Sequence, residues 1–160
     1  MKINFKLFFI LVGLTVIFSS CRTSAPRLDY QALARASVLL GIDINLEDDH
    51  KLYLEAADWI GAPYRGGGDS KRGTDCSGMV YQIYRKVYRI QVPRNTEELK
   101  NKSNKVAKRN LKEGDLVFFS SNRSRKRVAH VGIYLKSGKF IHSSTCLLYT
   151  SPSPRDRQKS

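Results

Sequence analysis

The stretch "RGTDCSGMVYQIYRKVY", residues 72–88, joins a glycine-rich loop to an amphipathic helix and places a cysteine at the junction. Asp75 stands where an N-cap is expected, because its carboxylate can accept hydrogen bonds from the first helical N–H groups. The partial positive charge of a helix N-terminus favours a thiolate, so this position suits a nucleophile better than a structural thiol. The apolar face of the predicted helix repeats at helical spacing and consists of Met79, Val80, Ile83, Tyr84 and Val87.

A nucleophilic cysteine needs a base, and the base needs a third group that orients it. The chain has three histidines, and His50, in the polar segment "EDDHK", is expected to be a solvated residue of an early helix. His130 opens the apolar segment "HVGIYL", and His142 lies within "FIHSS". Two histidines on consecutive strands after a cysteine at a helix start favour a reactive group made of Cys76, His130 and His142.

The segment "KSGK" between these strands predicts a hairpin, and its loop length decides where the histidines point. Side chains alternate between the two faces of a strand. A two-residue loop, Ser137-Gly138, would place the histidines on opposite faces. A three-residue loop or one bulge would set His130 opposite Ser144 and His142 opposite Gly132, as diagonal neighbours on one face. If the histidines act together, the hairpin cannot have a simple two-residue loop.

The order of the predicted elements indicates an α+β domain with an antiparallel sheet, because helices come first and strands follow. Helices are expected over 29–40, from 47 or 48 to 60, from Cys76 onward, and after an N-cap at Asn95 or Thr96. The glycine-rich segment 61–75 is predicted to be a loop, and "NRSRKRVAH", residues 122–130, a basic loop. The predicted strands are "GDLVFFS", "AHVGIYL" and "KFIHSS".

The N-terminal segment has the pattern of an export signal. Lys2 and Lys6 precede an apolar run from Leu7 to Phe18, which is too short to span a membrane comfortably. Two serines lead into Cys21, as at the processing site of a bacterial lipoprotein. We therefore expect residues 1–20 to be a lipoprotein signal peptide, Cys21 to be lipidated, and residues 21–28 to be the lipid anchor and linker. The alternative is an ordinary signal peptide that ends near a cysteine.

The charge of the chain limits its partners. Lysine and arginine number 28 against 14 acidic residues, a formal net charge of +14, which favours nucleic acid, anionic lipid or an acidic wall polymer. Export argues against nucleic acid. Exported cysteines tend to pair, so a disulfide between Cys76 and Cys146 is the alternative to a nucleophile. Three histidines without paired carboxylates nearby predict no metal site, and no other cofactor is expected.

The C-terminal segment "CLLYTSPSPRDRQKS", residues 146–160, has neither a helical nor an alternating pattern. It is similar to a translated sequencing adapter, and the three strands before it make a thin sheet for a domain of this size. We therefore expect residues 146–160 to be a non-native tail, the domain to be 29–145, and its last strand or strands to be missing.

The motifs "DCSG", "PR", "GDLVFF", "HVGIYL" and "FIHSST" together resemble the NlpC-type cell-wall cysteine peptidases, over about residues 52–145. The resemblance implies a papain-like core, with the nucleophile at a helix N-terminus packed on an antiparallel sheet. It implies that Cys76 is the nucleophile, that His130 is the general base and then acid, and that His142 orients His130. It assigns Tyr64, in "YRGGG", to stabilising the oxyanion together with the backbone N–H of Cys76.

The resemblance also implies a function and a place in the cell. The protein would be a monomeric, lipid-anchored endopeptidase that hydrolyses stem-peptide or cross-link amide bonds of peptidoglycan. It would sit in the cell envelope and face the periplasm, with the outer membrane favoured over the inner. Asp75 and Ser77 would contact the stem peptide, although Asp75 serves equally well as an N-cap alone. The alternatives are a papain-like amidase or acyltransferase, and a wall-binding lipoprotein without catalysis.

Overall fold

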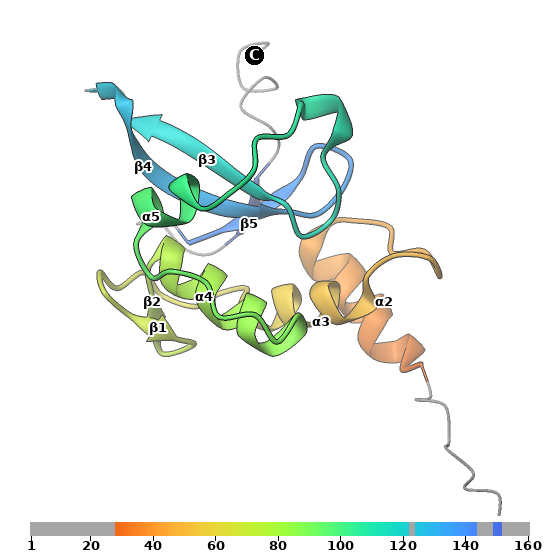
Figure 1. The fold of residues 1–160 in the computed structure, drawn as a ribbon. Helices are drawn as coiled ribbons and strands as arrows, with labels where there is room; N and C mark the ends of the chain where they lie inside the picture. The colour runs from red at the N-terminus through yellow and green to blue at the C-terminus, as the bar shows by residue number, and fades with distance from the viewer. Residues whose placement is uncertain (1–27, 122–123, 144–148, 152–160) are drawn as a thin grey trace, which may run out of the picture.

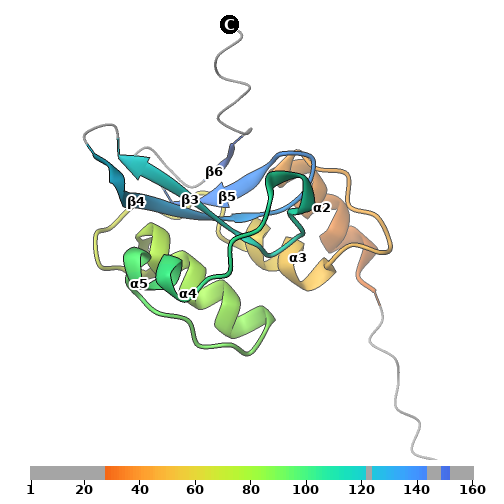
Figure 2. The same cartoon turned by 45° about the horizontal axis from the view of Figure 1, so that its top comes forward.

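A layer of helices packs against one face of an antiparallel sheet (Figure 1), and the turned view in Figure 2 separates the two layers. The structure is a computed structural model that describes residues 28–121, 124–143 and 149–151. For 121–128 and 149–151 it describes the backbone alone. The predicted α+β class is confirmed.

Each helix begins where the sequence provides a capping side chain. The N-caps are Asp29, Asp49, Asp75 and Asn95, and each side chain accepts hydrogen bonds from backbone N–H groups of the first turn. The second helix begins a few residues later than predicted. The helices are α2 (Tyr30–Leu40), α3 (His50–Asp58), α4 (Cys76–Val87) and α5 (Thr96–Asn101), followed by a 3-10 turn η1 (Lys108–Asn110).

The apolar stripes of these helices meet the sheet in one core. Leu52, Met79 and Ile83 are fully buried on the helical side, and Val131 and Ile133 are fully buried on the sheet side. α4 packs against both α3 and β4, so the helix that begins at Cys76 lies at the centre of the molecule. Burial of this apolar surface is the main force that holds α4 against the sheet.

The sheet contains the three predicted strands in sequence order and a fourth. The strands β3 (Leu116–Ser121), β4 (Ser124–Tyr134), β5 (Phe140–His142) and β6 (Tyr149–Ser151) are neighbours in that order, and all pairs are antiparallel. β6 lies in the segment for which no strand was predicted, so that part of the prediction was wrong. Its three residues carry too little alternation to show a strand, and backbone pairing with β5 supplies its hydrogen bonds.

The basic run 122–130 was predicted to be a loop, and this was wrong for most of its length. β4 begins at Ser124 and pairs with β3, with irregular register between Phe119 and Ser121. A run of charged residues shows no apolar alternation, so the pattern cannot reveal a strand that is held by its backbone. The loop predicted over 61–75 likewise contains a short antiparallel ribbon, β1 (Asp69–Ser70) with β2 (Gly73–Thr74).

No helix within the described ranges is both long enough and apolar enough to cross a membrane. The predicted signal peptide, the anchor at Cys21 and Cys146 lie outside the described residues.

Candidate active site

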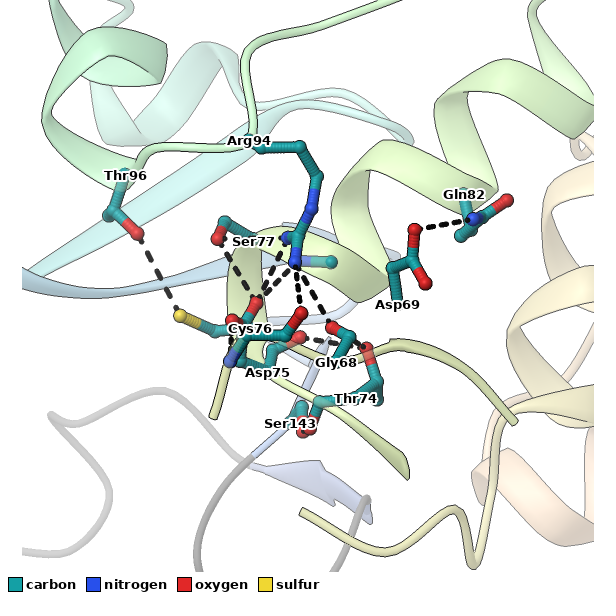
Figure 3. Close-up of polar contacts among 12 residues, drawn as sticks. Gly68, Asp69, Thr74, Asp75, Cys76, Ser77, Gln82, Arg94, Thr96 and Ser143 are labelled. Atoms are coloured by element: carbon teal, nitrogen blue, oxygen red, sulfur yellow. Dashed lines mark hydrogen bonds and ion pairs between the residues drawn. The ribbon is translucent and has the colours of Figure 1, made fainter. Parts of the chain in front are cut away.

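Cys76 is the first residue of α4, and Asp75 is its N-cap, as predicted. The carboxylate of Asp75 accepts a hydrogen bond of 2.7 Å from the N–H of Gly78. Cys76 is a partly buried free thiol. Its Sγ lies 3.8 Å from Oγ1 of Thr96, the first residue of α5 (Figure 3). The thiol therefore sits between the positive end of one helix and the first turn of another.

Asp75 accepts further hydrogen bonds around its carboxylate. The N–H of Gly67 donates to Oδ2 at 2.8 Å, and the hydroxyl of Ser77 donates to Oδ1 at 3.1 Å. Burial by itself would raise the pKa of Asp75, but the hydrogen bonds from Arg94, Gly78 and Gly67 outweigh it and hold the pKa below its ordinary value. The capping role of Asp75 is confirmed, whereas contact of Asp75 and Ser77 with a stem peptide stays a prediction.

Arg94 is a site residue that sequence reasoning missed. Its Nη1 donates to Oδ1 of Asp75 at 3.1 Å and to the hydroxyl of Ser77 at 3.2 Å. Its Nη2 donates to the carbonyls of Gly67 and Gly68, each at 3.2 Å. In Figure 3 the guanidinium lies over the first residues of α4. The only signal in the sequence was the "PR" pair, which carried no assigned role.

Gly78 allows the glycine-rich loop to approach α4 closely. A Cβ at this position would lie 2.1 Å from the carbonyl oxygen of Gly68 and 2.9 Å from Nη1 of Arg94. No side chain fits at these distances. The glycine of "DCSG" is therefore required by the contact between the loop and the helix, not by a turn.

The two histidines face each other, as the hairpin argument required. Nε2 of His130 lies 2.7 Å from Nδ1 of His142, and the rings are nearly perpendicular, with centroids 4.9 Å apart. β4 and β5 pair Ile133 with Ile141 and Tyr134 with Phe140. Leu135 then hydrogen-bonds to Lys139, so the loop contains the three residues between them. The prediction that the hairpin is not a simple two-residue one is confirmed.

Aromatic side chains surround the histidine pair. The ring of Phe119 lies 6.0 Å from that of His130, and the ring of Phe140 lies 5.2 Å from that of His142, between centroids. His142 is buried, and burial lowers the pKa of His130 below its ordinary value. Near neutral pH His130 is therefore uncharged and able to accept a proton.

Thr74 connects the two halves of the site. Its carbonyl accepts a hydrogen bond of 2.9 Å from the hydroxyl of Ser143, the residue after His142, and another of 2.9 Å from the N–H of Arg65. Thr74 also forms a parallel bridge with Tyr64, whose side chain is 44% exposed. The loop of Tyr64, the start of α4 and the strand of His142 thus meet at one residue. His50 lies elsewhere, at the start of α3, where its Nε2 is 2.7 Å from the carbonyl oxygen of Asn45.

A helix that begins at a cysteine and packs on an antiparallel sheet bearing a histidine pair is the arrangement of a papain-like cysteine hydrolase. Residues 61–154 match the model of the NlpC/P60 family, and the chain belongs to this family. It is therefore of a class of cysteine peptidases that hydrolyse peptidoglycan, as the names of its relatives indicate.

Two curated relatives and one solved structure illustrate the similarity. The "Probable endopeptidase NlpC homolog" of Haemophilus influenzae is 32% identical over 162 residues, covering 88% of this chain and 85% of its own. The "Murein DD-endopeptidase MepS/Murein LD-carboxypeptidase" of Escherichia coli is 38% identical over 101 residues, covering 63% of this chain and 52% of its own. The crystal structure of the NlpC/p60 domain of the peptidoglycan hydrolase SagA has a TM-score of 0.57 at 28% identity, covering 68% of this chain and 90% of that one.

Proposed function

We propose that this protein is a lipid-anchored peptidoglycan endopeptidase that uses Cys76, His130 and His142 for thiol catalysis. The observation that carries the proposal is the 2.7 Å contact between the two imidazoles, on the sheet against which α4 packs. A histidine that only packs in the core does not need a second histidine to hydrogen-bond its Nε2. A catalytic base does, because an orienting group fixes both its ring position and its tautomer.

The proposed mechanism gives a role to each nitrogen of His130. Nε2 faces Nδ1 of His142. In the tautomer in which this Nε2 carries the proton, Nδ1 of His130 would be the nitrogen that accepts a proton from Cys76. The thiolate attacks the amide carbonyl carbon, and the C–N bond breaks as the imidazolium gives its proton to the leaving amine. Water then attacks the thioester, with His130 again taking its proton, and the product acid leaves while the thiol is restored.

The oxyanion would be stabilised at the N-terminus of α4. The backbone N–H of Cys76 belongs to the first turn, whose N–H groups have no partner within the helix. Tyr64 pairs with Thr74, which lies two residues before Cys76. The hydroxyl of Tyr64 is proposed as the second hydrogen-bond donor to the oxyanion. Loss of one such donor costs about 10²- to 10³-fold in kcat in comparable sites.

The substrate proposed is the peptide part of peptidoglycan. Its stem peptides carry carboxylates, which a chain of net charge +14 attracts. The name of the Escherichia coli relative favours the D-alanine–diaminopimelate cross-link over the γ-D-glutamyl–diaminopimelate bond. Asp75 and Ser77 are proposed to contact the stem peptide beside the nucleophile.

The proposed location is the cell envelope, with the protein anchored through lipidated Cys21 and acting as a monomer that faces the periplasm. The outer membrane is favoured over the inner. Mass spectrometry of the N-terminal peptide from membrane fractions tests this. The mass of a lipidated Cys21 supports the anchor, and an unmodified N-terminus at another residue contradicts it.

Defined cross-linked muropeptides test the activity. The purified protein is incubated with them and the products are read by mass spectrometry, beside Cys76→Ser and His130→Gln variants. His50→Gln is the matched control, since His50 lies outside the site. Circular dichroism confirms that each sample is folded.

We expect a Cys76- and His130-dependent product whose mass names the bond. Cleavage next to the sugar would instead identify an amidase. A folded sample that binds peptidoglycan and yields no product would support the non-catalytic alternative.

A further inference from the structure

Asp75 creates an electrostatic problem for the nucleophile that follows it. Its carboxylate lies next to Cys76 in the chain, and its lowered pKa keeps it charged near neutral pH. A negative charge at the N-cap opposes the positive end of α4, which would otherwise favour a thiolate at its first residue. The N-cap therefore helps the helix to begin and works against the thiol at the same time.

Arg94 provides the opposing charge. We propose that Arg94 is a positioning residue that keeps the Cys76 thiolate accessible by neutralising the Asp75 carboxylate beside it. The inference rests on the proposed role of Cys76 as nucleophile. The guanidinium of Arg94 binds Oδ1 of Asp75, and both side chains are largely shielded from solvent. The side chain of Arg94 is 33% exposed and that of Asp75 is 17% exposed. Partial burial makes such a pair stronger than one on the open surface.

The site is built around this arginine. The guanidinium uses two nitrogens for four acceptors: Asp75, Ser77 and the carbonyls of Gly67 and Gly68. The absent side chain of Gly78 leaves the space that the guanidinium and the Gly68 carbonyl occupy. The same segment holds the thiol from the other side, because Thr96, two residues after Arg94, contacts Sγ of Cys76 (Figure 3).

Other charges near α4 have partners of their own or lie along its length. Glu55 of α3 pairs with Lys86 in the last turn, and Asp69 of β1 accepts a hydrogen bond from Gln82 in the middle of the helix. Asp75 is the N-cap carboxylate that binds the first turn of α4. Further titratable groups on the elements around this end are Tyr64 and Arg65 on the loop, Glu97 and Glu98 in the first turn of α5, and His130 and His142 on the sheet.

The test measures thiol reactivity and needs no substrate. The full chain is alkylated with iodoacetamide across a pH series, and modification of Cys76 is followed by peptide mass mapping, which separates it from Cys21 and Cys146. The variants are Arg94→Gln, Arg94→Lys and Asp75→Asn, with exposed Arg109→Gln as the matched control. Circular dichroism accompanies each.

For Arg94→Gln, we expect the alkylation midpoint to rise by about one pH unit and the rate at pH 7 to fall about tenfold. Arg94→Lys keeps the positive charge, and its alkylation midpoint should lie within about half a pH unit of that of the natural protein. Arg109→Gln leaves the profile unchanged. A folded Arg94→Gln with an unshifted midpoint overturns the proposal and assigns Arg94 to holding the loop alone.

Asp75→Asn decides the matter if Arg94→Gln does not fold, because it leaves Arg94 unopposed and should lower the midpoint. If Arg94→Gln does fold, the Asp75→Asn/Arg94→Gln double variant should return the midpoint toward that of the natural protein. A midpoint that rises in Asp75→Asn contradicts charge neutralisation. If the midpoint depends on Arg94 but the chain cleaves no muropeptide, this inference stands and the proposed function is wrong. If the chain cleaves muropeptides but the midpoint does not depend on Arg94, the proposed function stands and this inference is wrong.

Discussion

At the scale of the residue, Gly78 shows how closely the loop and the helix approach each other. In a helix interior, alanine is ordinarily more favourable than glycine by about 1 kcal/mol. Here a Cβ would meet the carbonyl of Gly68 at 2.1 Å, so the loop or the helix has to move. Helix propensity favours alanine at this position and packing favours glycine. Packing has the larger effect, because the Gly68 carbonyl leaves no space for a Cβ.

Gly78→Ala should lower the free energy of unfolding by about 1–3 kcal/mol, because overpacking displaces the loop. Urea unfolding measures the change. Gly66→Ala is the matched control, since a Cβ there would have no atom within 4 Å, and we expect a change within about 0.5 kcal/mol. A Gly78→Ala protein as stable as the natural one would show that the loop yields without cost.

His142→Ala should lower kcat/KM by about 10²- to 10⁴-fold, because Nε2 of His130 loses the group that orients it. His142→Asn restores a hydrogen-bonding side chain and should retain more activity. Kinetics on a defined muropeptide across pH measure both variants, and a change in the acidic limb separates orientation from loss of stability. Equal activity of the alanine and asparagine variants would contradict the orienting role.

The residues that sequence could predict are those whose chemistry is read locally. Asp75 and Cys76 stand next to each other at a helix start, and the two histidines stand in apolar strands. Arg94 could not be predicted, because its role depends on a long side chain that crosses to a loop and a helix cap 17 to 27 residues away in sequence.

At the scale of the element, the hairpin between β4 and β5 sets the geometry of the histidine pair. Its three-residue loop includes Ser137 at φ 54° and Gly138 at φ 77°, both left-handed. Glycine adopts this conformation freely, whereas serine pays about 1–2 kcal/mol for it. The loop is thus maintained by the pairing of the strands on either side.

Replacing each loop residue should therefore change stability in opposite directions. Gly138→Ala should lower the free energy of unfolding by about 1 kcal/mol, and Ser137→Gly should raise it by up to about 1 kcal/mol. Urea titrations measure both. Neither change alters the register, so Ser137→Gly should keep full activity, and a large loss of activity would show that the loop does more than connect strands.

That the hairpin does not have a simple two-residue loop was predictable from a joint role of the histidines, because only an odd loop or a bulge puts them on one face. The early start of β4 and the presence of β6 could not be predicted from the sequence. Both depend on backbone pairing with a neighbouring strand and show no apolar pattern of their own.

At the scale of the whole molecule, buried titratable groups confine stability to a window of pH. Burial lowers the pKa of His130, so the unfolded chain binds a proton more readily than the folded one. The contribution of His130 to the free energy of unfolding is therefore fully present above the ordinary pKa of 6.5 and is lost as the pH falls below it. Burial, with the nearby charge of Asp115, raises the pKa of Tyr84 to about 12. Its contribution to the free energy of unfolding is therefore fully present below pH 10 and is lost as the pH rises toward 12.

The melting temperature should therefore be highest and nearly flat between about pH 6.5 and 10. Below pH 3.8 a second loss follows, because Asp75, whose pKa is lowered, gives up its stabilising charge. Scanning calorimetry across pH measures the profile. His130→Gln should flatten the slope just below pH 6.5, and an unchanged slope in that variant would assign it to another group.

The hydrogen bond between Ser143 and Thr74 joins segments 69 residues apart in the chain. During synthesis the helix that begins at Cys76 is therefore complete long before the strands that carry His130 and His142 exist. A chain interrupted before β4 would carry the proposed nucleophile without its proposed base. Under the proposed function, the order of synthesis would therefore delay hydrolysis until almost the whole domain is present.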